Sequence, residues 1–409
     1  MTEASRAIER VARLSYGKLV ARLVARTGSL ADAEDALSDA LIAALETWPA
    51  TGVPENPEAW LTRAAKNRAI DRARSGALPT TYEHELTRMA EERAATSAPA
   101  TDPRIPLMFV CAHPAIDPSL RAPLMLQAVL GLDARRMASV FLIPPGTLSQ
   151  RLTRVKAKIE TAAVTFDLPE GRDFEDRMGD VLKAIYAAYA VGYNGIPAGD
   201  PKAAGLAHEA IWLASLVAAG YPDAAEAHGL FALMLFAEAR RPARTDSTTG
   251  ALIPLEEQDT SLWDAALMAD AEKALRNASR HASLGRYQLE ASIQAVHAAR
   301  QRTGNTDWSE LALLSAGLVQ VAPTIGALTG RAAVLAETEG PRAALAALHA
   351  IPEDARKAYQ PWWATLAHVL ARLGDVEPAC AAFDRAIGLS DDPAATRYLV
   401  ARKAWLLQS

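Results

Sequence analysis

Apolar residues recur at intervals of three and four along most of the chain, the spacing that places them on one face of an α-helix. The segment 37–48 shows this spacing with Leu37, Leu41, Ala44, Leu45 and Trp48. Aromatic residues make up only 6% of the sequence and alanine is abundant, which favours packed helices over β-sandwiches. The sequence therefore predicts an all-α fold.

The helical periodicity breaks most clearly between Ser75 and Pro106, in a stretch rich in Ala, Thr, Ser and Pro. We interpret this stretch as a linker, because 409 residues exceed what one hydrophobic core usually serves. The expected parts are a helical domain over 1–75, the linker over 76–105, a compact helical domain over 106–162 and a helical extension over 163–409.

The extension contains an internal repeat. Its two copies superpose with an offset of 34 residues, which aligns Gly340 with Gly374, Ala333 with Ala367 and Ala347 with Ala381. This offset is the period of tetratricopeptide (TPR) repeats, in which small residues let paired helices approach and each pair buries its apolar stripe against the next. We expect a TPR-like extension in which more divergent repeats precede the two visible copies.

Carboxylates gather at the start of one predicted helix in the first domain. Asp32, Glu34 and Asp35 lie on its first turn, where negative charge is favourable. Asp35 and Asp39 stand four residues apart and share an exposed face. From the pattern alone a solvated surface is the favoured interpretation, and a docking face for a basic partner is the alternative.

The next predicted helix starts where Asn56, a favourable N-cap residue, precedes Pro57. Five Lys and Arg residues follow between positions 63 and 74. One arc of this helix holds Arg63, Lys66, Asn67 and Arg74, but Ile70 lies within it and Arg68 and Arg72 lie opposite. The periodicity therefore leaves open which face is buried.

The second domain carries a helix-turn-helix pattern. Asp133 caps a short helix that runs to Val140, residues 142–145 form the turn, and a second helix spans Gly146 to Ile159. A buried stripe is expected from Leu148, Leu152, Val155 and Ile159. The opposite side offers Ser149, Gln150 and Thr153 to base edges and Arg151, Arg154, Lys156 and Lys158 to phosphates. Plain helical hairpins share this pattern, so by itself it favours DNA binding and simple packing equally.

Charge is distributed unevenly along the chain. Residues 1–160 hold 21 Lys and Arg against 18 Asp and Glu, a net charge of +3, whereas the remainder holds 22 against 30, a net charge of -8. The basic residues of the first part cluster on the two helices just described, as local phosphate-binding surfaces do. The overall charge of -5 therefore conceals two basic surfaces.

Three segments resemble the extracytoplasmic-function (ECF) sigma factors of the sigma-70 family. ADAEDALSDALIAAL (31–45) is similar to the region 2 helix that docks on the polymerase clamp, and PENPEAWLTRAAKNRAIDRARS (54–75) to the segment that melts and reads the minus-ten element. IPPGTLSQRLTRVKAKI (143–159) resembles the region 4 recognition helix for the minus-thirty-five element. MFVCAHPAID (108–117) and ARRPARTDSTTGALIPLEEQDTSLWD (239–264) resemble the ECF subgroup that ends in a TPR-like domain, so the resemblance spans nearly the whole chain.

The resemblance implies a non-enzymatic RNA polymerase subunit that needs no cofactor and recognises promoter DNA. Residues implied to face the clamp of the polymerase beta-prime subunit are Asp32, Glu34, Asp35, Ser38 and Asp39. Those implied to contact the minus-ten strand are Trp60, Arg63, Lys66, Asn67, Arg68, Asp71 and Arg72. Those implied to contact the minus-thirty-five element are Thr147, Ser149, Gln150, Arg151, Thr153, Arg154, Lys156 and Lys158. Ser38 replaces a common Gln and Ser149 a common Lys of the family.

Two further groups of residues suggest other chemistry. Cys111 and His113 could bind a metal, but two ligands do not make a site, and a structural histidine before Pro114 is the favoured interpretation. A polar stretch around an expected hairpin at Thr248 to Leu255 is a candidate regulatory loop, with charge pairing that holds the loop as the favoured alternative. Its residues are Arg240, Arg241, Arg244, Asp246, Glu257, Gln258, Asp259 and Trp263.

The absence of several sequence motifs argues against an enzyme, a zinc-binding protein and a membrane or secreted protein. It has no Gly-rich phosphate loop, HExxH or GxSxG motif, and its two cysteines form no CxxC pair, which argues against an enzyme and a zinc site. Without an apolar signal segment or a run of eighteen apolar residues, a cytoplasmic protein without a membrane partner is expected. The alternative to a sigma factor is a TPR adaptor. An intramolecular contact between the acidic extension and the basic sigma segments is a further expectation.

Overall fold

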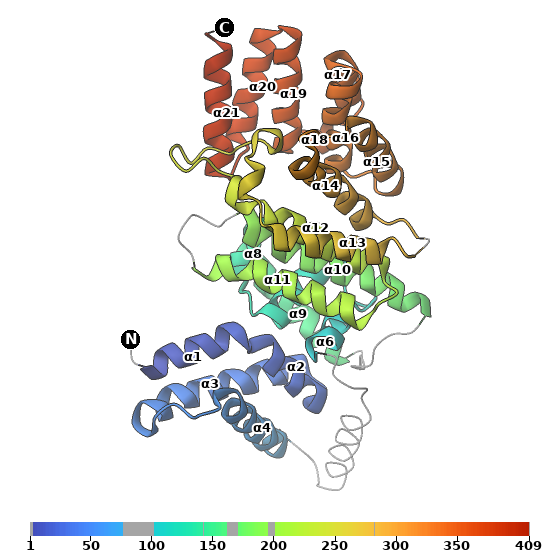
Figure 1. Cartoon of the computed structure of the whole chain (residues 1–409). Coiled ribbons are helices and arrows are strands. Elements are labelled where there is room, and N and C mark those ends of the chain that lie inside the picture. The colour runs from blue at the N-terminus through green and yellow to red at the C-terminus, as the bar shows by residue number, and fades with distance from the viewer. Residues whose placement is uncertain are drawn as a thin grey trace. The chain divides into compact units, whose positions relative to one another are not determined.

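The computed structural model describes residues 3–76, 102–141, 143–161, 171–194, 201–281 and 283–408. Every regular element among them is an α-helix or a 3-10 helix, and the one strand-like pairing is an isolated bridge between Thr245 and Leu252. The predicted all-α fold is confirmed (Figure 1). Of the helices described, none is both long and apolar enough to cross a membrane. The chain divides into two compact units, the first ending at Val191 and the second starting at Gly192.

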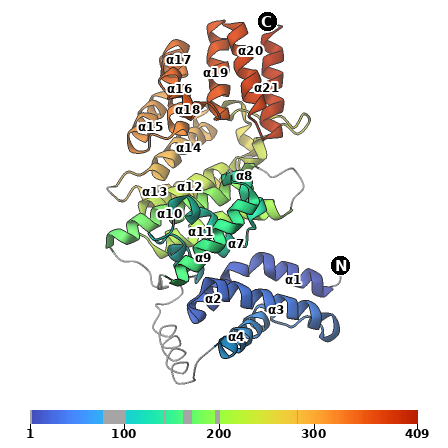
Figure 2. The ribbon, with the colours of Figure 1, turned by 180° about the vertical axis from the view of Figure 1, so that it is seen from behind.

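The first unit consists of two groups of helices that follow one another in sequence. The first group comprises α1 (Glu3–Leu14), α2 (Tyr16–Thr27), α3 (Leu30–Thr51) and α4 (Pro57–Gly76). The second comprises α6 (Arg104–Cys111), α7 (Pro118–Leu130), α8 (Ala134–Phe141), α9 (Pro145–Thr161) and α10 (Gly171–Asn194), whose last residues belong to the second unit (Figure 2). Helix α2 packs on α6 and α7, and α3 packs on α9, so both groups share one compact unit.

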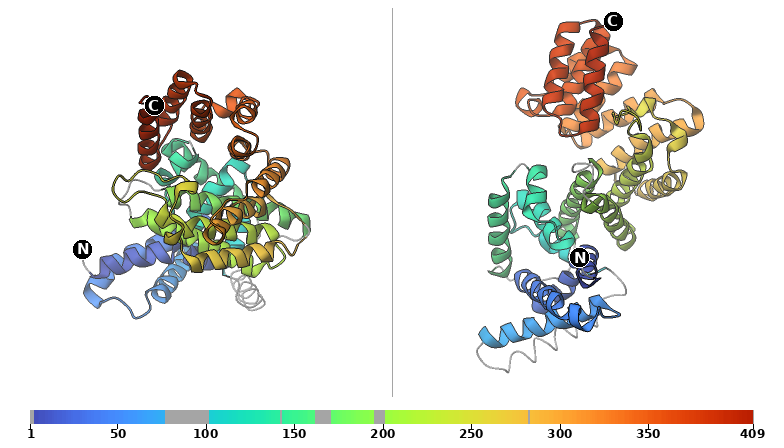
Figure 3. Two further views of the ribbon diagram at one scale, coloured as in Figure 1. Left: turned by 45° about the horizontal axis from the view of Figure 1, so that its top comes forward. Right: turned by 90° about the vertical axis from the view of Figure 1, so that its left-hand side faces the viewer.

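The second unit is built mainly from helices joined by short turns. They are α11 (Pro201–Gly220), α12 (Ala225–Ala239), η1 (Arg241–Ala243), η2 (Leu255–Glu257), η3 (Thr260–Leu262), α13 (Ala265–Ala278), α14 (Arg286–Thr303), α15 (Trp308–Val321), α16 (Ile325–Thr338), α17 (Pro341–His349), α18 (Glu353–Arg356), α19 (Gln360–Leu373), α20 (Val376–Gly388) and α21 (Pro393–Leu406). The pairs α12/α13, α14/α15, α16/α17 and α19/α20 pack as hairpins that follow one another toward the C-terminus (Figure 3).

The two copies of the sequence repeat coincide with two of these hairpins, α16/α17 and α19/α20. The aligned glycines Gly340 and Gly374 both adopt positive φ, 93° and 82°, between their paired helices. Glycine is favoured there because a Cβ atom would strain the left-handed backbone.

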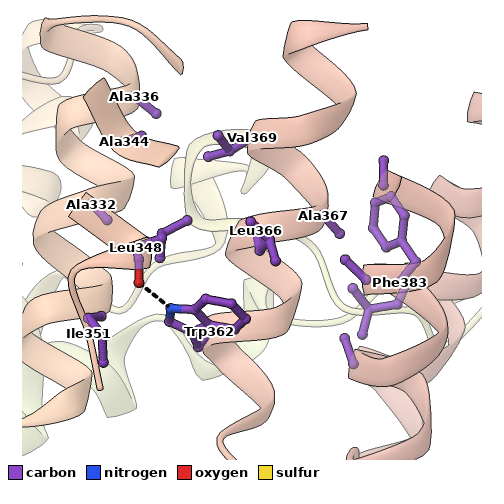
Figure 4. Packing of buried hydrophobic residues seen from close by; sticks show 14 of the residues in the cluster. Ala332, Ala336, Ala344, Leu348, Ile351, Trp362, Leu366, Ala367, Val369 and Phe383 are labelled. Atoms are coloured by element: carbon purple, nitrogen blue, oxygen red, sulfur yellow. Dashed lines mark hydrogen bonds between the residues drawn. The ribbon is translucent and has the colours of Figure 1, made fainter. Parts of the chain in front are cut away.

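Large side chains from both hairpins meet in one core. Trp362 on α19 packs beside Leu366 and donates its indole N–H to the carbonyl of Leu348, 3.1 Å away, at the end of α17 (Figure 4). Phe383 on α20 contributes to the same buried cluster. Truncating a buried aromatic residue of this kind costs about 3–5 kcal/mol, so the indole stabilises the packing of α17 against α19.

Helix α3 shows how closely the apolar pattern predicts burial. Its N-cap is Ser29, whose hydroxyl accepts the backbone N–H of Asp32 at 3.1 Å. Leu37, Ala44 and Trp48 are buried as predicted, but Leu45 is 51% exposed. Since each residue turns the helix by about 100°, Leu45 lies some 80° from Leu37, at the edge of the stripe. The buried stripe is therefore narrower than the sequence pattern indicates.

The helix boundaries also differ from the sequence expectation around the linker and after α9. Helix α4 runs to Gly76 and α6 begins at Arg104, while 77–101 of the predicted linker lie outside the described residues. Helix α10, expected to open the extension, packs largely within the first unit. Phe174 stacks on Phe109 with ring centroids 5.1 Å apart, and Asp180 forms an ion pair with Arg121. The division between the two compact units falls inside α10, and the domain boundary expected at residue 162 lies outside the described residues and stays a prediction.

Candidate polymerase and nucleic-acid interface

Helix α9 exposes most of the residues implied to read the minus-thirty-five element. The stripe predicted to be buried is confirmed, because Leu148, Leu152, Val155 and Ile159 are all buried. The exposed members of the predicted set are Thr147, Ser149, Gln150, Arg151, Thr153, Arg154 and Lys158. Neither Arg151 nor Arg154 forms an ion pair with another described residue. Both guanidinium groups are therefore available to phosphates.

Two lysines of the same predicted set point elsewhere. Lys156 forms an ion pair with Glu34 of α3, and Lys158 donates to the carbonyl oxygen of Ala115, 2.6 Å away. Their position near the C-terminal end of α9 explains this, because that end lies against α3 and the loop before α7. Among the basic residues of the set, the two that no described contact holds, Arg151 and Arg154, lie on the central turns of α9.

Helix α4 begins as the sequence predicts, since the Asn56 side-chain oxygen accepts the backbone N–H of Ala59 at 3.0 Å. Leu61 and Ala65 are fully buried. Leu61 and Ala65 therefore mark the buried face of α4, which the periodicity of the sequence did not identify. On the other faces Arg63, Asn67 and Arg68 are exposed and Lys66 is partly buried, whereas Asp71 and Arg72 lie on α4 with side chains outside the described set.

Trp60, on the first turn of α4, is partly buried against the fully buried Trp48 of α3. The two rings meet edge to face, with centroids 5.4 Å apart and an interplanar angle of 72°. This contact places Trp60 partly in the core between α3 and α4, while part of the ring remains accessible.

The acidic side of α3 forms a stripe that the sequence analysis only partly identified. Asp32, Asp35 and Ser38 are exposed, Asp39 is partly buried, and Glu34 turns inward to Lys156. The stripe continues with Ile42 and Leu45, which are 54% and 51% exposed. Ile42, which lies outside the predicted apolar stripe, was the sequence signal for this surface, whereas Leu45 was part of that stripe. A surface that combines carboxylates with exposed aliphatic groups suits a protein partner.

In the second unit, the candidate regulatory residues hold a long loop between α12 and α13. Arg241 binds Glu238 through two hydrogen bonds of 2.7 and 2.8 Å, and Arg244 binds Asp392 at 2.8 Å. Arg240 donates to Gln294, and the Asp259 carboxylate accepts the N–H of Ser261 at 2.9 Å. Trp263 is only 3% exposed, and the Arg300 guanidinium lies 5.3 Å from its ring centroid. These contacts support the alternative in which charge pairing holds the loop.

The hairpin expected at Thr248 to Leu255 is reduced to a tight turn closed by the bridge between Thr245 and Leu252. The Asp246 carboxylate accepts the backbone N–H groups of Thr248 and Thr249 at 2.9 and 2.7 Å. Hydrogen bonds from Thr249 and Thr248 lower the pKa of Asp246. Asp246 thus organises the turn by side-chain bonding where a strand ladder was expected.

The pair Cys111 and His113 has a structural explanation. The His113 Nδ1 atom accepts the backbone N–H of Ala115 at 3.1 Å, as the favoured interpretation required. Cys111 is fully buried, and this burial raises the pKa of its thiol. Throughout the described ranges, no three side chains of the metal-binding types gather into one group.

Comparison with known proteins shows which family the helices α2, α3 and α4 resemble. Residues 12–77, which contain the end of α1 and all of α2, α3 and α4, match the family model for sigma-70 region 2. An uncharacterized protein of Rhizobium meliloti (strain 1021) is 34% identical over 374 residues, which cover 90% of this chain and 88% of that protein. The chain belongs to the same family as this rhizobial protein. Its region 2 supports its assignment as a sigma-70 family factor, whose partners are core RNA polymerase and promoter DNA.

Residues 177–279, which include the loop between α12 and α13, match a family of unknown function, DUF6596. No solved structure matches the chain. The second unit is therefore a helical extension on a sigma-70 region 2 protein, and sigma-70 family members are not enzymes.

Proposed function

We propose that this protein is an ECF sigma factor that binds core RNA polymerase through α3 and directs it to promoters through α4 and α9. The observation that carries the proposal is the match of residues 12–77 to sigma-70 region 2. The acidic and aliphatic stripe of α3 and the exposed basic residues of α4 lie inside that segment, on different helices. One small domain can therefore offer separate surfaces to a protein and to DNA.

The α3 stripe is proposed to dock on the clamp of the polymerase beta-prime subunit. Its carboxylates, Asp32, Asp35 and Asp39, supply charge that steers association and fixes register. Ile42 and Leu45 supply apolar area at the centre of the contact, where most binding energy is usually found.

Promoter recognition is proposed to be divided between two helices. Arg63, Asn67 and Arg68 of α4 would contact the minus-ten strand, and the N-terminal half of α9 would enter the major groove at the minus-thirty-five element. Gln150 and Thr153 lie on the exposed face of α9 beside Arg151 and Arg154. This placement allows base and phosphate contacts from a single helix.

The extension is proposed to be TPR-like and regulatory, as in the ECF subgroup that the sequence resembles. Its support is the succession of hairpins and the equivalent glycines, Gly340 and Gly374. The same hairpins would suit a TPR adaptor without sigma activity, which is the second candidate. The region 2 match favours the sigma factor, because an adaptor gives no reason for it.

Charge reversal on α3 tests the docking surface. Asp35→Lys combined with Asp39→Lys should reduce copurification with core polymerase at least about tenfold, because two attractive contacts become repulsive. Asp270→Lys combined with Glu310→Lys changes the net charge equally, at two exposed positions of the second unit, and should bind normally. Full-yield copurification of a folded α3 variant would reject the docking surface. Failure of the unaltered chain to bind core polymerase would reject the sigma factor in favour of the adaptor.

A further inference from the structure

The loop between α12 and α13 contacts two helices that are far apart in the sequence. Arg300, near the end of α14, donates to the carbonyl oxygens of Leu255 and Gln258 at 2.7 and 3.0 Å. The loop also reaches the first turn of α21, where the N–H of Leu252 donates to the carbonyl oxygen of Ala394 at 2.9 Å (Figure 1). Helices α15 to α20 lie between α14 and α21 in the sequence. The loop therefore bridges the array of helices from α14 to the last helix.

Several of these contacts are made to the main chain of the loop. Arg397 of α21 donates to the carbonyl oxygen of Gly250 at 3.1 Å, and Gln301 of α14 donates to that of Thr260 at 3.0 Å. The backbone is extended at Pro254, with φ -55° and ψ 148°, and at Gln258, with φ -65° and ψ 138°. Main-chain hydrogen bonds to an extended segment give affinity with little demand on its sequence. The loop is thus held in the way that a bound peptide would be.

One side chain of the loop is recognised by both of its carboxylate oxygens. Glu256 accepts the ring N–H of His297 at 3.1 Å on one oxygen and the hydroxyl of Thr306 at 2.9 Å on the other. The His297 side chain is only 14% exposed. Burial lowers the pKa of His297, and the nearby charges of Arg240 and Arg300 lower it further. The surface of α14 therefore offers a positively charged site that fits one carboxylate.

The loop lies outside the hydrophobic core of the helices that it contacts. No residue from 245 to 262 is buried, and Leu262 is 53% exposed. Among the described residues, the core cluster around Trp362 and Phe383 includes none from this segment. A segment with few buried apolar contacts can detach while the structure beneath it stays folded. Trp263, which is only 3% exposed, would remain as the anchor at the end of the loop.

We propose that residues 245–262 are an intramolecular ligand on a peptide-binding surface formed by α14 and α21, and that a partner protein displaces them with an extended acidic segment. The proposal rests on the TPR-like regulatory extension proposed above. The partner's carboxylate takes the place of Glu256 at His297, and its main chain takes the hydrogen bonds from Arg300 and Arg397. The tethered loop competes at an effective concentration of roughly a millimolar, so the surface is closed to weak ligands.

A labelled peptide with the sequence of residues 245–262 tests the proposal, with fluorescence anisotropy as the measure of binding to the full chain. In one variant of the chain, Gly and Ser residues replace 245–262 at equal length. This variant should bind the peptide at least about tenfold more tightly than the parent, because no tethered loop competes. The matched control is the peptide with Glu256→Lys, which should bind the variant at least about tenfold more weakly, since Lys cannot accept from His297 and Thr306. Equal binding of the unaltered peptide by parent and variant, or no binding by a folded variant, would overturn the proposal.

If the Gly and Ser variant does not fold by circular dichroism, Asp392→Asn replaces it. The amide can still cap α21 at Ala394, but the ion pair with Arg244, which precedes the displaced segment, is lost. Hydrogen exchange of the Leu252 amide should become at least about tenfold faster, whereas Asp391→Asn, at the exposed neighbouring position, should leave it unchanged. Unchanged exchange in Asp392→Asn would overturn the proposal.

Copurification with core polymerase is measured on the same proteins. A chain that binds polymerase but shows no competition between loop and peptide contradicts only the intramolecular ligand. A chain that shows this competition but does not bind polymerase contradicts the sigma function and supports the peptide-binding surface.

Discussion

Helix α9 and the loop between α12 and α13 are both rich in arginine, yet they use it in opposite ways. Arg151 and Arg154 of α9 are exposed and make no ion pair with a described residue. Arg241 and Arg244 of the loop are bound to Glu238 and Asp392. A basic cluster in a sequence is therefore evidence of nucleic-acid binding only when the carboxylates that could neutralise it lie elsewhere in the fold.

The largest expected effect concerns Arg300, which donates to the backbone carbonyls of Leu255, Glu256 and Gln258 and covers Trp263. Arg300→Ala should destabilise the second unit by about 4 kcal/mol, because three loop carbonyls lose a charged donor. Urea unfolding measures the change, with the exposed Arg280→Ala as the control. Wild-type stability of the Arg300 variant would show that the loop is not held by this side chain.

The second effect is a loss of stability of the second unit in acid, which arises at His368. Burial lowers the pKa of His368, which packs against Phe383 and Tyr398, to about 4. The unfolded pKa is higher, about 6.5, so the neutral ring favours the folded state above that pH. As the pH falls from about 6.5 to 4, about 3 kcal/mol of stability should be lost.

His368→Leu removes this titrating group and should reduce the difference in unfolding free energy between pH 7 and pH 4 by that amount. Urea unfolding at the two pH values measures the difference for parent and variant. An equal acid sensitivity in both would assign the loss to other groups.

The third effect concerns the promoter sequence that α9 prefers. Gln150→Ala should change the preferred upstream element, with about 2 kcal/mol of discrimination lost at one base pair. Selection from a randomised promoter library measures the preference of each protein. An unchanged preference would place Gln150 away from the bases and reject this orientation of α9.

The smallest effect is expected at Arg154, where a phosphate contact should be lost without a change in sequence preference. Arg154→Ala should weaken binding to all promoters by about 1 kcal/mol and reduce the salt dependence by about one counterion. Titrations of the polymerase complex with promoter DNA at several salt concentrations measure both quantities. A weakening confined to one promoter sequence would instead indicate a base contact.

The sequence by itself determined the local features of this protein. Short-range rules were sufficient for the start of α4 at Asn56, the stripe of Leu148 and Leu152 on α9 and the repeat marked by Gly340 and Gly374. Capping, periodicity and backbone conformation depend on residues a few positions apart, so a linear sequence contains the information they require.

Only the tertiary structure decided which charged side chains are paired and which parts of each helix surface are buried. Glu34 and Lys156 are 122 residues apart, and their contact reverses the exposure that each pattern indicates. Leu45 is 51% exposed, so no helix of the described residues covers that edge of α3. Arg244 and Arg240 of the loop between α12 and α13 are bound to Asp392 and Gln294, which are 148 and 54 residues away. Burial and ion pairing depend on which segments meet in space, and spacing along one helix cannot specify that.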